Sequence, residues 1–274
     1  MKKLLWILPF CLLVLASCNF PLSKTPSISA SEISTRVAQT LQASANPENP
    51  TATPSLIPTT SLLTVTPTFT PTVTPTATTS PDDPRLTLGN PTFTGLFTKS
   101  SSFGLPYSDD SITMNITNGS MFMVSSKSRN FHWRLTYPTP RDFYLEGKFK
   151  TIACSGSDYY GLVMRSTNYD DGVGYYFGIS CNGQYYLMRY NGTDPNIIID
   201  WTTDPALLAG QNQENRIGVM LKEDQISLYI NGKFIQKVSN DTIKEKGHFG
   251  VFQYPVDTSN MTIEVEEINE WDQP

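Results

Sequence analysis

From about residue 86 onward, hydrophobic residues form short runs that alternate with polar residues, and Gly, Asn and Asp separate the runs. Alternation over four to eight residues is typical of half-buried β-strands, and almost nothing here has the period of a helix. The pattern predicts about a dozen strands, at residues 112–116, 121–124, 131–135, 143–153, 160–165, 175–179, 185–190, 216–221, 225–230, 233–238, 248–252 and 261–266.

Four Asn-Gly pairs lie between these runs, beginning at Asn118, Asn182, Asn191 and Asn231. Each pair can supply the positive φ angles of a type I′ turn, the usual link of a tight β-hairpin. Many short strands joined by hairpins predict an all-β fold over residues 86–274. We expect a two-sheet antiparallel β-sandwich.

The first residues have the pattern of an export signal. Two lysines precede an apolar run over residues 4–15, which is too short to span a bilayer, and small residues follow it. Leu15-Ala16-Ser17-Cys18 resembles the end of a bacterial lipoprotein signal peptide. The resemblance implies cleavage after residue 17 and attachment of lipid, palmitate included, to Cys18. The protein would then be exported and held at the cell membrane, facing the extracytoplasmic side; an ordinary secretory signal would leave a soluble product.

Residues 18–85 are rich in Ser, Thr and Pro and carry little charge. Ile33, Val37 and Leu41 have helical spacing, so a short helix over 31–44 is one prediction. Repeated Thr-Pro units beyond it cannot bury enough apolar surface to offset the entropy of ordering. We predict a disordered tether, which at roughly 3.1 Å per residue could hold a domain on the order of 100 Å from the membrane.

Charge and cysteine content narrow the function further. Without the two lysines of the signal peptide, the chain has 18 basic and 25 acidic residues, a net charge of −7, which excludes nucleic acid as an expected partner. Cys154 and Cys181 remain once Cys11 leaves with the signal and Cys18 takes lipid. In an oxidising compartment they predict a disulfide. Each cysteine ends a predicted strand, and these two strands lie on either side of the one predicted at 160–165. Within one sheet the cysteines would then be roughly 10 Å apart, too far for a disulfide unless the turn at 155–158 bends across the intervening strand.

Three segments carry a family resemblance. Residues 158–165 (DYYGLVMR), 174–179 (GYYFGI) and 182–187 (NGQYYL) together resemble the centre of a concanavalin A-like (laminin G-like) jelly roll. Residues 215–219, 228–233 and 247–252 continue the resemblance. It implies the fold of lectins and glucanases and, with it, glycan binding. The same scaffold also hosts hydrolases and adhesive modules, so the fold alone leaves the function open.

Strand alternation suggests which side chains could meet a ligand. If Leu162 and Phe177 point into the core, Gly161 and Gly178 lie on the opposite face and open a shallow, aromatic-edged surface. The candidate ligand-binding residues on or beside that surface are Arg165, Tyr176, Arg189, Tyr190 and Trp201. The alternative is structural: Tyr is a common strand residue with an apolar body and a polar tip, and Trp201 could cap the core.

Candidate chemistry is sparse. Neither histidine has the spacing of a metalloprotease, and the run containing Glu264, Glu266, Glu267 and Glu270 lacks the middle Asp of a laminarinase-type motif. We interpret these glutamates as solvated charges that protect an edge strand, and we predict no catalytic residue. Asp170 and Asp171 offer oxygen ligands for calcium, but they also suit an ordinary turn, and no cofactor is expected.

These features lead to one main hypothesis and two alternatives. The main hypothesis is a membrane-anchored surface lipoprotein that displays a non-catalytic β-sandwich and binds a polysaccharide or cell-envelope glycan. The first alternative is a glycoside hydrolase-like enzyme, which needs two carboxylates converging in a groove. The second is a protein-adhesion or structural module.

Overall fold

The computed structural model describes residues 80–98, 102–272 and 274. The predicted signal peptide, Cys18 and the tether with its helix at 31–44 lie outside these residues. Within the described part, no helix is long and apolar enough to cross a membrane. Its elements are α2 (Arg85–Leu88), β1 (Phe93–Gly95), β2 (Tyr107–Ser108), β3 (Ile112–Thr117), β4 (Ser120–Ser125), β5 (His132–Thr136), β6 (Phe143–Ala153), β7 (Tyr159–Ser166), β8 (Gly174–Ser180), β9 (Gln184–Tyr190), β10 (Pro195–Thr203), β11 (Glu214–Lys222), β12 (Gln225–Ile230), β13 (Lys233–Ser239), β14 (His248–Tyr254) and β15 (Thr262–Asp272).

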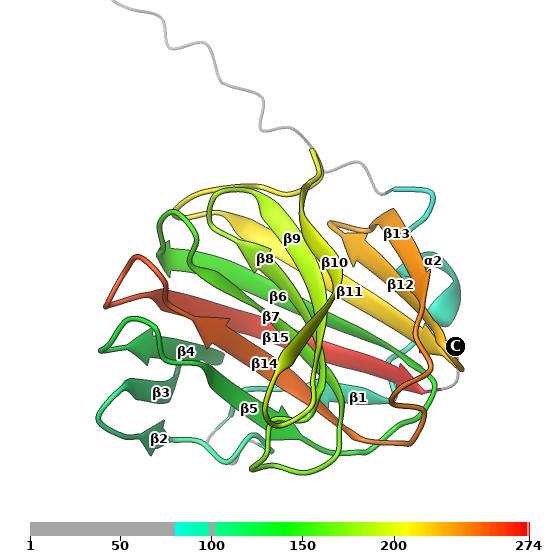
Figure 1. Ribbon diagram of the computed structural model, residues 1–274, viewed down its shortest axis with the longest axis horizontal. Coiled ribbons are helices and arrows are strands. Elements are labelled where there is room, and N and C mark those ends of the chain that lie inside the picture. Colours follow the sequence, from blue (N-terminus) through cyan, green and yellow to red (C-terminus); the bar gives the residue numbers. More distant parts are fainter. Residues whose placement is uncertain (1–79, 99–101, 273) are drawn as a thin grey trace, which may run out of the picture. The chain divides into compact units, whose positions relative to one another are not determined.

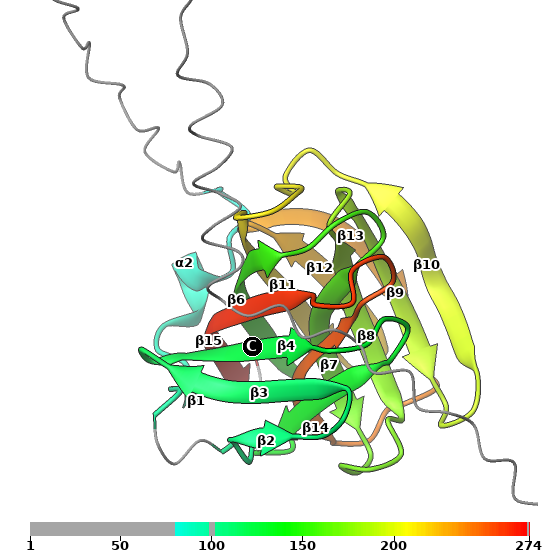
Figure 2. The same ribbon diagram turned by 90° about the vertical axis from the view of Figure 1, so that its left-hand side faces the viewer.

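The strands form two antiparallel sheets packed face to face (Figure 1). One sheet has nine strands in the order β13-β12-β11-β6-β15-β4-β3-β2, with β1 paired to β15. The other has six strands in the order β10-β9-β8-β7-β14-β5. Figure 2 shows the two layers from the side, with α2 beside the layer of β6 and β15 and with β10 on the opposite side of the molecule. The predicted two-sheet antiparallel β-sandwich is confirmed.

All twelve predicted strands are present, and two of them, β6 and β12, have the predicted bounds. The pattern missed β1, β2, β10 and the second half of β15. The first two are only three and two residues long. β10 is an edge strand whose side chains are mostly exposed, and its register with β9 shifts twice. Such a strand has no clear alternation because only one of its residues, Ile199, is buried.

All four Asn-Gly pairs lie in hairpin connections, but only two have the predicted turn. Both residues have positive φ at Asn118-Gly119 and at Asn231-Gly232, as a two-residue type I′ turn requires. At Asn182-Gly183 and Asn191-Gly192 only the glycine has positive φ. Those connections are longer, at residues 181–183 and 191–194, so a glycine alone completes the turn.

The main core lies between the sheets, as the alternation predicted. Leu162 and Met164 of β7 and Phe177 of β8 belong to it and are completely buried. Val163 and Tyr176, on the opposite side of these strands, belong to a second cluster on the outer face of the six-stranded sheet. This outer face therefore carries its own hydrophobic layer.

The predicted disulfide between Cys154 and Cys181 is present, with a Cα–Cα distance of 5.9 Å. The expected geometry was wrong, because Cys154 follows β6 of the nine-stranded sheet and Cys181 follows β8 of the six-stranded sheet. The bond therefore joins the two sheets rather than two strands of one sheet. The placement of both cysteines in one sheet was wrong because the sequence does not reveal that the chain crosses between sheets at residues 154–158.

The interpretation of the glutamate run was also wrong. β15 lies inside its sheet, paired with β6 on one side and with β4 and β1 on the other, so it protects no edge. Glu264, Glu266 and Glu267 are partly exposed, whereas Glu270 is completely buried. A register shift between Val265 and Glu267 changes which side chains point inward beyond that point.

Candidate functional site

Partly exposed aromatic rings cover the outer face of the six-stranded sheet. We call this surface the aromatic face and define it by Phe131, Trp133, Tyr159, Tyr190, Trp201 and Tyr254. Neighbouring rings lie 5.1–6.0 Å apart along the path Trp201, Tyr159, Tyr254, Phe131, Trp133. The path crosses from β10 at one edge of the sheet to β5 at the other.

A buried layer supports these rings from below. Tyr176, Tyr186 and Phe252 are almost inaccessible and contact the rings above them. The glycine at 178 provides space for this layer, because a Cβ there would lie 2.1 Å from the Tyr186 ring. Gly178 therefore makes room for an aromatic ring of the protein, rather than for a ligand as the sequence suggested.

A recess of about 180 Å³ opens at one end of the aromatic face. Residues from five parts of the chain line it: the β6–β7 loop, the β8–β9 hairpin region, β7, β10 and the β14–β15 loop. They are Ser157, Tyr159, Ser180, Asn182, Gln184, Trp201 and Val256. The recess thus combines two aromatic walls with four neutral polar side chains and no charged one.

Part of the polar wall is free to bind. The Ser180 hydroxyl donates to Asn182 Oδ1 at 2.6 Å and accepts from the Gln184 backbone N–H at 3.0 Å, so it is committed to the hairpin. The Asn182 Nδ2 and the whole Gln184 side-chain amide make no hydrogen bond to the described residues. These amides can donate and accept hydrogen bonds at the same opening.

The hydroxyls of Tyr159 and Tyr176 stay protonated over the physiological range. Burial raises the pKa of Tyr159 well above its usual value, with the nearby Tyr254 adding to the effect. Burial also raises the pKa of Tyr176, whose hydroxyl donates to the Gly172 carbonyl at 2.6 Å. Both side chains are therefore neutral phenols rather than phenolates.

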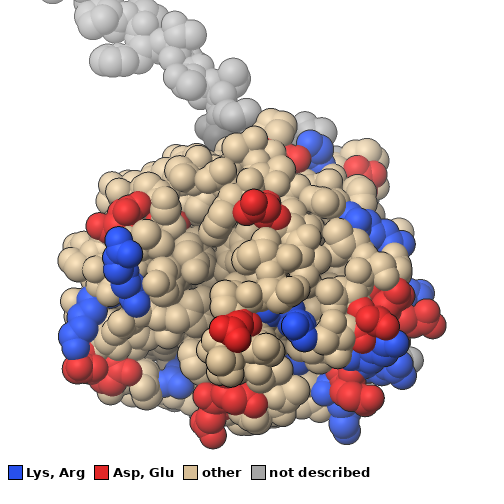
Figure 3. Space-filling view, in the orientation of Figure 1, with Lys and Arg blue, Asp and Glu red and all other residues tan. Residues whose placement is uncertain are grey.

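Charge lies mainly around this face rather than on it. Figure 3 views the molecule from the six-stranded sheet: most acidic and basic residues lie toward the periphery, and a few lie nearer the middle with uncharged surface between them. The strands β5, β7, β8, β9 and β14 contain no Asp or Glu at all. A carboxylate pair such as a glycosidase needs is therefore absent from these five described strands.

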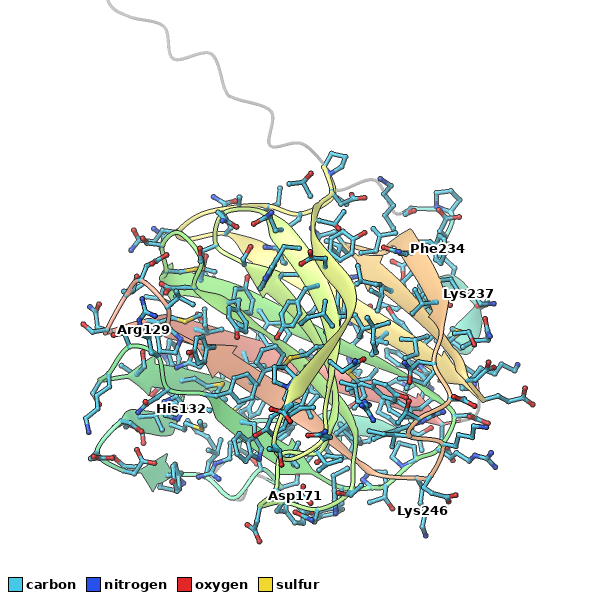
Figure 4. All side chains as sticks on the ribbon, in the orientation of Figure 1. Arg129, His132, Asp171, Phe234, Lys237 and Lys246 are labelled. Carbon is cyan, nitrogen blue, oxygen red and sulfur yellow. A yellow bond between two sulfur atoms is a disulfide. The ribbon has the colours of Figure 1, made fainter. Side chains whose placement is uncertain are left out.

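The loop that contains Asp170 and Asp171 lies at another edge of the face, where Figure 4 labels Asp171. The Asp171 carboxylate accepts hydrogen bonds from the Thr167 hydroxyl at 3.2 Å and from the Val173 N–H at 2.9 Å, and so closes the loop. Trp133 Nε1 donates to the Tyr169 carbonyl and fixes the loop against the aromatic face. Among the described residues, no cluster of three or more His, Cys, Asp or Glu is placed to hold a metal ion.

The five predicted ligand-binding residues separate into three groups. Trp201, 37% exposed, and Tyr190 lie on the aromatic face, and Tyr176 lies buried beneath it. Arg189 shares its side of β9 with inward-facing residues, because it pairs with the buried Tyr175. Arg165 also lies elsewhere, in a buried position near the end of β7.

Arg165 is 1% exposed and serves to hold loops together. Its guanidinium donates to the backbone carbonyls of Arg141, Glu223 and Ile243, each at 2.9 Å, and pairs with Asp142 at 3.2 Å. Its φ angle of +49° departs from ordinary strand geometry, so alternation no longer predicts its direction. A ligand-binding role for Arg165 is therefore unsupported.

Most of the aromatic face was not predicted. Phe131 and Trp133 lie in or beside β5, and Tyr254 ends β14, so their proximity to Tyr159 depends on the order β7-β14-β5. The sequence contains one usable signal, the density of aromatic residues at alternate positions of these segments. It gives no indication of which strands are neighbours.

Comparisons with known proteins agree with this architecture. A family model described as "Domain of unknown function (DUF6250)" matches residues 164–264. No curated protein matches the chain. A Bacillus subtilis protein of unknown function with a galectin-like fold is similar in structure, with a TM-score of 0.53 and 11% identity over 67% of this chain and 96% of that one. At this identity the likeness shows the fold alone.

Two other solved structures have lower scores. The carbohydrate binding module CBM66 from Bacillus subtilis has a TM-score of 0.42 and 14% identity, over 67% of this chain and 98% of that one. A Bacillus licheniformis beta-glucanase has a TM-score of 0.49 and 10% identity, over 68% of this chain and 99% of that one.

Proposed function

We propose that this protein is a lipid-anchored surface protein whose β-sandwich binds glycan at the aromatic face, without catalysis. The observation that carries the proposal is the combination of partly exposed rings with a recess of uncharged hydrogen-bonding side chains. Sugars have apolar C–H faces and hydroxyl edges, so they need both kinds of contact. A surface that only closed the core would need no open recess with free amides.

The rings supply the apolar part of the interaction. Trp201 and Tyr159 meet at a centroid distance of 5.3 Å with their planes 67° apart, so they form two walls at an angle. Tyr186 packs beneath Trp201 at 4.3 Å and fixes the indole. Rigid rings lose little conformational entropy on binding, which favours recognition of a flat ligand.

The binding role is favoured over hydrolysis because five of the six strands of this sheet, all except β10, lack Asp and Glu. Glycosidases use two carboxyl groups that flank the scissile bond, separated by about 5–9.5 Å. Asp200 lies on β10 and Asp257 in the β14–β15 loop, and each is committed to a backbone N–H, of Trp201 and of Ser157 respectively. Among the six described strands of this sheet, Asp200 is the only Asp or Glu.

Binding is tested by affinity gel electrophoresis in gels that contain mixed-linkage β-glucan, xylan, galactomannan or polygalacturonate. We expect at least one neutral polymer to retard the protein, and Trp201→Ala to reduce its affinity about tenfold or more, since loss of a ring at the centre of a binding site typically costs over 1 kcal/mol. Phe234→Ala is the matched control: Phe234 is similarly exposed, at 40%, but lies on β13 of the other sheet (Figure 4). No retardation in any gel would reject the glycan proposal.

Anchoring rests on Cys18 and the residues before it. We expect cells fed with radiolabelled palmitate to incorporate label into the wild-type protein, which would then fractionate with membranes. Cys18→Ala should abolish labelling and release the protein, because the thiol is the acceptor of the lipid. Cys11→Ala, within the predicted signal peptide, is the control and should leave labelling intact. An unlabelled wild-type protein would contradict the anchor and leave the glycan proposal untouched.

A further inference from the structure

Three loops meet beside the recess, and each contributes to its wall. The β6–β7 loop supplies Ser157, the β8–β9 hairpin supplies Asn182, and the β14–β15 loop supplies Val256. Strand pairing brings the ends of these loops together, because Tyr159 is in register with Ser180 on one side and with Tyr254 on the other. Beyond those residues no strand pairing joins the three loops, and loops usually tolerate movement. The recess therefore depends on whatever links them.

A single buried carboxylate connects two of these loops. Asp158 is 0% exposed. Its Oδ1 accepts hydrogen bonds from the backbone N–H groups of Val256 at 2.8 Å, Asp257 at 2.7 Å and Thr258 at 3.1 Å. Its Oδ2 accepts from the Ser155 N–H at 3.0 Å. Hydrogen bonds to an ionised group are stronger than neutral ones, so this carboxylate holds the β14–β15 loop firmly against the β6–β7 loop.

The third loop is attached at the same place. The Cys181 N–H donates to the Asp158 backbone carbonyl at 2.8 Å, and Cys181 is covalently bonded to Cys154. The disulfide thus connects the β8–β9 hairpin to the start of the β6–β7 loop. Ser157 and Asn182 are the sequence neighbours of Asp158 and Cys181, and Val256 donates a hydrogen bond to Asp158 directly, so each loop residue of the recess is attached to this carboxylate or to the disulfide.

We propose that Asp158 and the Cys154–Cys181 disulfide form a positioning centre that holds the three loops in the geometry of the recess, and that breaking it disables the recess before it unfolds the domain. The inference rests on the proposed function in one respect, that the recess is the glycan-binding site. Cys154 and Cys181 are members of the core between the sheets, but the rest of that core and the hydrophobic cluster beneath the aromatic face lie outside this centre, so the sandwich retains most of its buried surface when the centre is broken.

The first test needs no ligand. The full chain is labelled with 5-fluorotryptophan, and the ¹⁹F resonances are assigned by single Trp→Phe changes. In Asp158→Ala, and separately in the double variant Cys154→Ala with Cys181→Ala, we expect the Trp201 resonance to shift or broaden. The resonances of Trp133, at the other side of the same face, and of the buried Trp271 should stay in place. Unchanged Trp201 signals in both variants would overturn the proposal, and so would simultaneous loss of all three folded-state signals.

Asp109→Ala is the matched control. The Asp109 carboxylate also accepts four hydrogen bonds, but only from Tyr107, Ser111 and Ile112, at the far β2–β3 edge of the other sheet. We expect it to leave the Trp201 resonance unchanged. Asp158→Asn keeps one carbonyl oxygen as an acceptor, so it should restore the Trp201 signal only in part. A merely space-filling role predicts full restoration, because Asn has nearly the same shape as Asp.

The second test uses the polysaccharide gels described above. Asp158→Ala and the double cysteine variant should lose retardation by tenfold or more in affinity while remaining folded, and Asp109→Ala should bind as the wild type does. Full retardation of the folded Asp158→Ala and cysteine variants would overturn the proposal. If no gel retards the wild-type protein, the glycan proposal fails, and the fluorine spectra still decide whether the positioning centre exists.

Discussion

Replacing Arg216 with alanine is expected to lower the free energy of unfolding by about 3 kcal/mol, because the change removes the ion-pair partner of the buried Asp83 and leaves the buried Glu146 with Arg85 alone. Arg216 lies on β11 and faces outward from the nine-stranded sheet. Its guanidinium pairs with Asp83 and with Glu146, the latter at 3.4 Å. Both carboxylates are nearly inaccessible, so water cannot replace the lost partner.

The electrostatics of Glu146 explain the size of this effect. Burial raises the pKa of the Glu146 carboxyl, while Arg216 and Arg85 oppose the rise. The Tyr144 hydroxyl also donates to Glu146 Oε2 at 2.8 Å. Without Arg216, the Glu146 carboxyl keeps Arg85 as an ion-pair partner, but it must either stay charged with less compensation in a dry site or take up a proton, and both alternatives cost free energy.

Urea unfolding at pH 7 measures this change, with Lys148→Ala as the control. Lys148 is the direct neighbour of Arg216 across the β6–β11 pair and forms ion pairs with Glu214 and Glu266 on the same face. Those partners are partly exposed, so its loss should cost less than about 1 kcal/mol. Equal losses in the two variants would show that burial of the carboxylates does not determine the effect.

Replacing Glu270 with glutamine is expected to stabilise the protein above pH 7 and to leave it almost unchanged near pH 4. Glu270 is 0% exposed, and neither of its carboxyl oxygens has a hydrogen-bond partner among the described residues. Burial, with a smaller contribution from Asp272, raises the pKa of this carboxyl to about 7. The folded protein therefore holds a proton on Glu270 that the unfolded chain releases near pH 4.5.

The direction of the pH dependence follows from proton binding. Between about pH 4.5 and 7 the folded state binds more protons than the unfolded state, so the contribution of Glu270 to stability falls as the pH rises. The raised pKa corresponds to roughly 3 kcal/mol lost by pH 8, since one pKa unit is about 1.4 kcal/mol. Glutamine cannot ionise, so the variant avoids this loss.

The test measures the free energy of unfolding of Glu270→Gln and of the wild type at pH 4, 6 and 8 and takes the difference between them at each pH. We expect that difference to grow steadily with pH. Glu264→Gln, a partly exposed glutamate on the same strand, is the control and should show a small, nearly constant difference. A Glu270→Gln variant that is no more stable than the wild type at pH 8 would refute the assignment of a buried, unpaired carboxyl.

The sequence by itself determined the class of fold and most strand positions. Alternation of apolar and polar residues is imposed locally by the two faces of each strand, so the first and last residues of β6 and β12 could be predicted correctly. The sequence also correctly predicted the disulfide between Cys154 and Cys181, because the two remaining cysteines allow only one pairing. The inward direction of Leu162 and Phe177 followed from the same local rule.

The tertiary structure alone decided which strands are neighbours and which sheet each belongs to. Sheet order depends on contacts between residues far apart in the chain, and the local pattern carries no information about them. For this reason the sequence placed the disulfide within one sheet, expected Arg165 at a surface and assigned Glu270 to an edge. For the same reason it missed Phe131, Tyr159 and Tyr254 as a group, whose rings meet only because β7, β14 and β5 lie side by side.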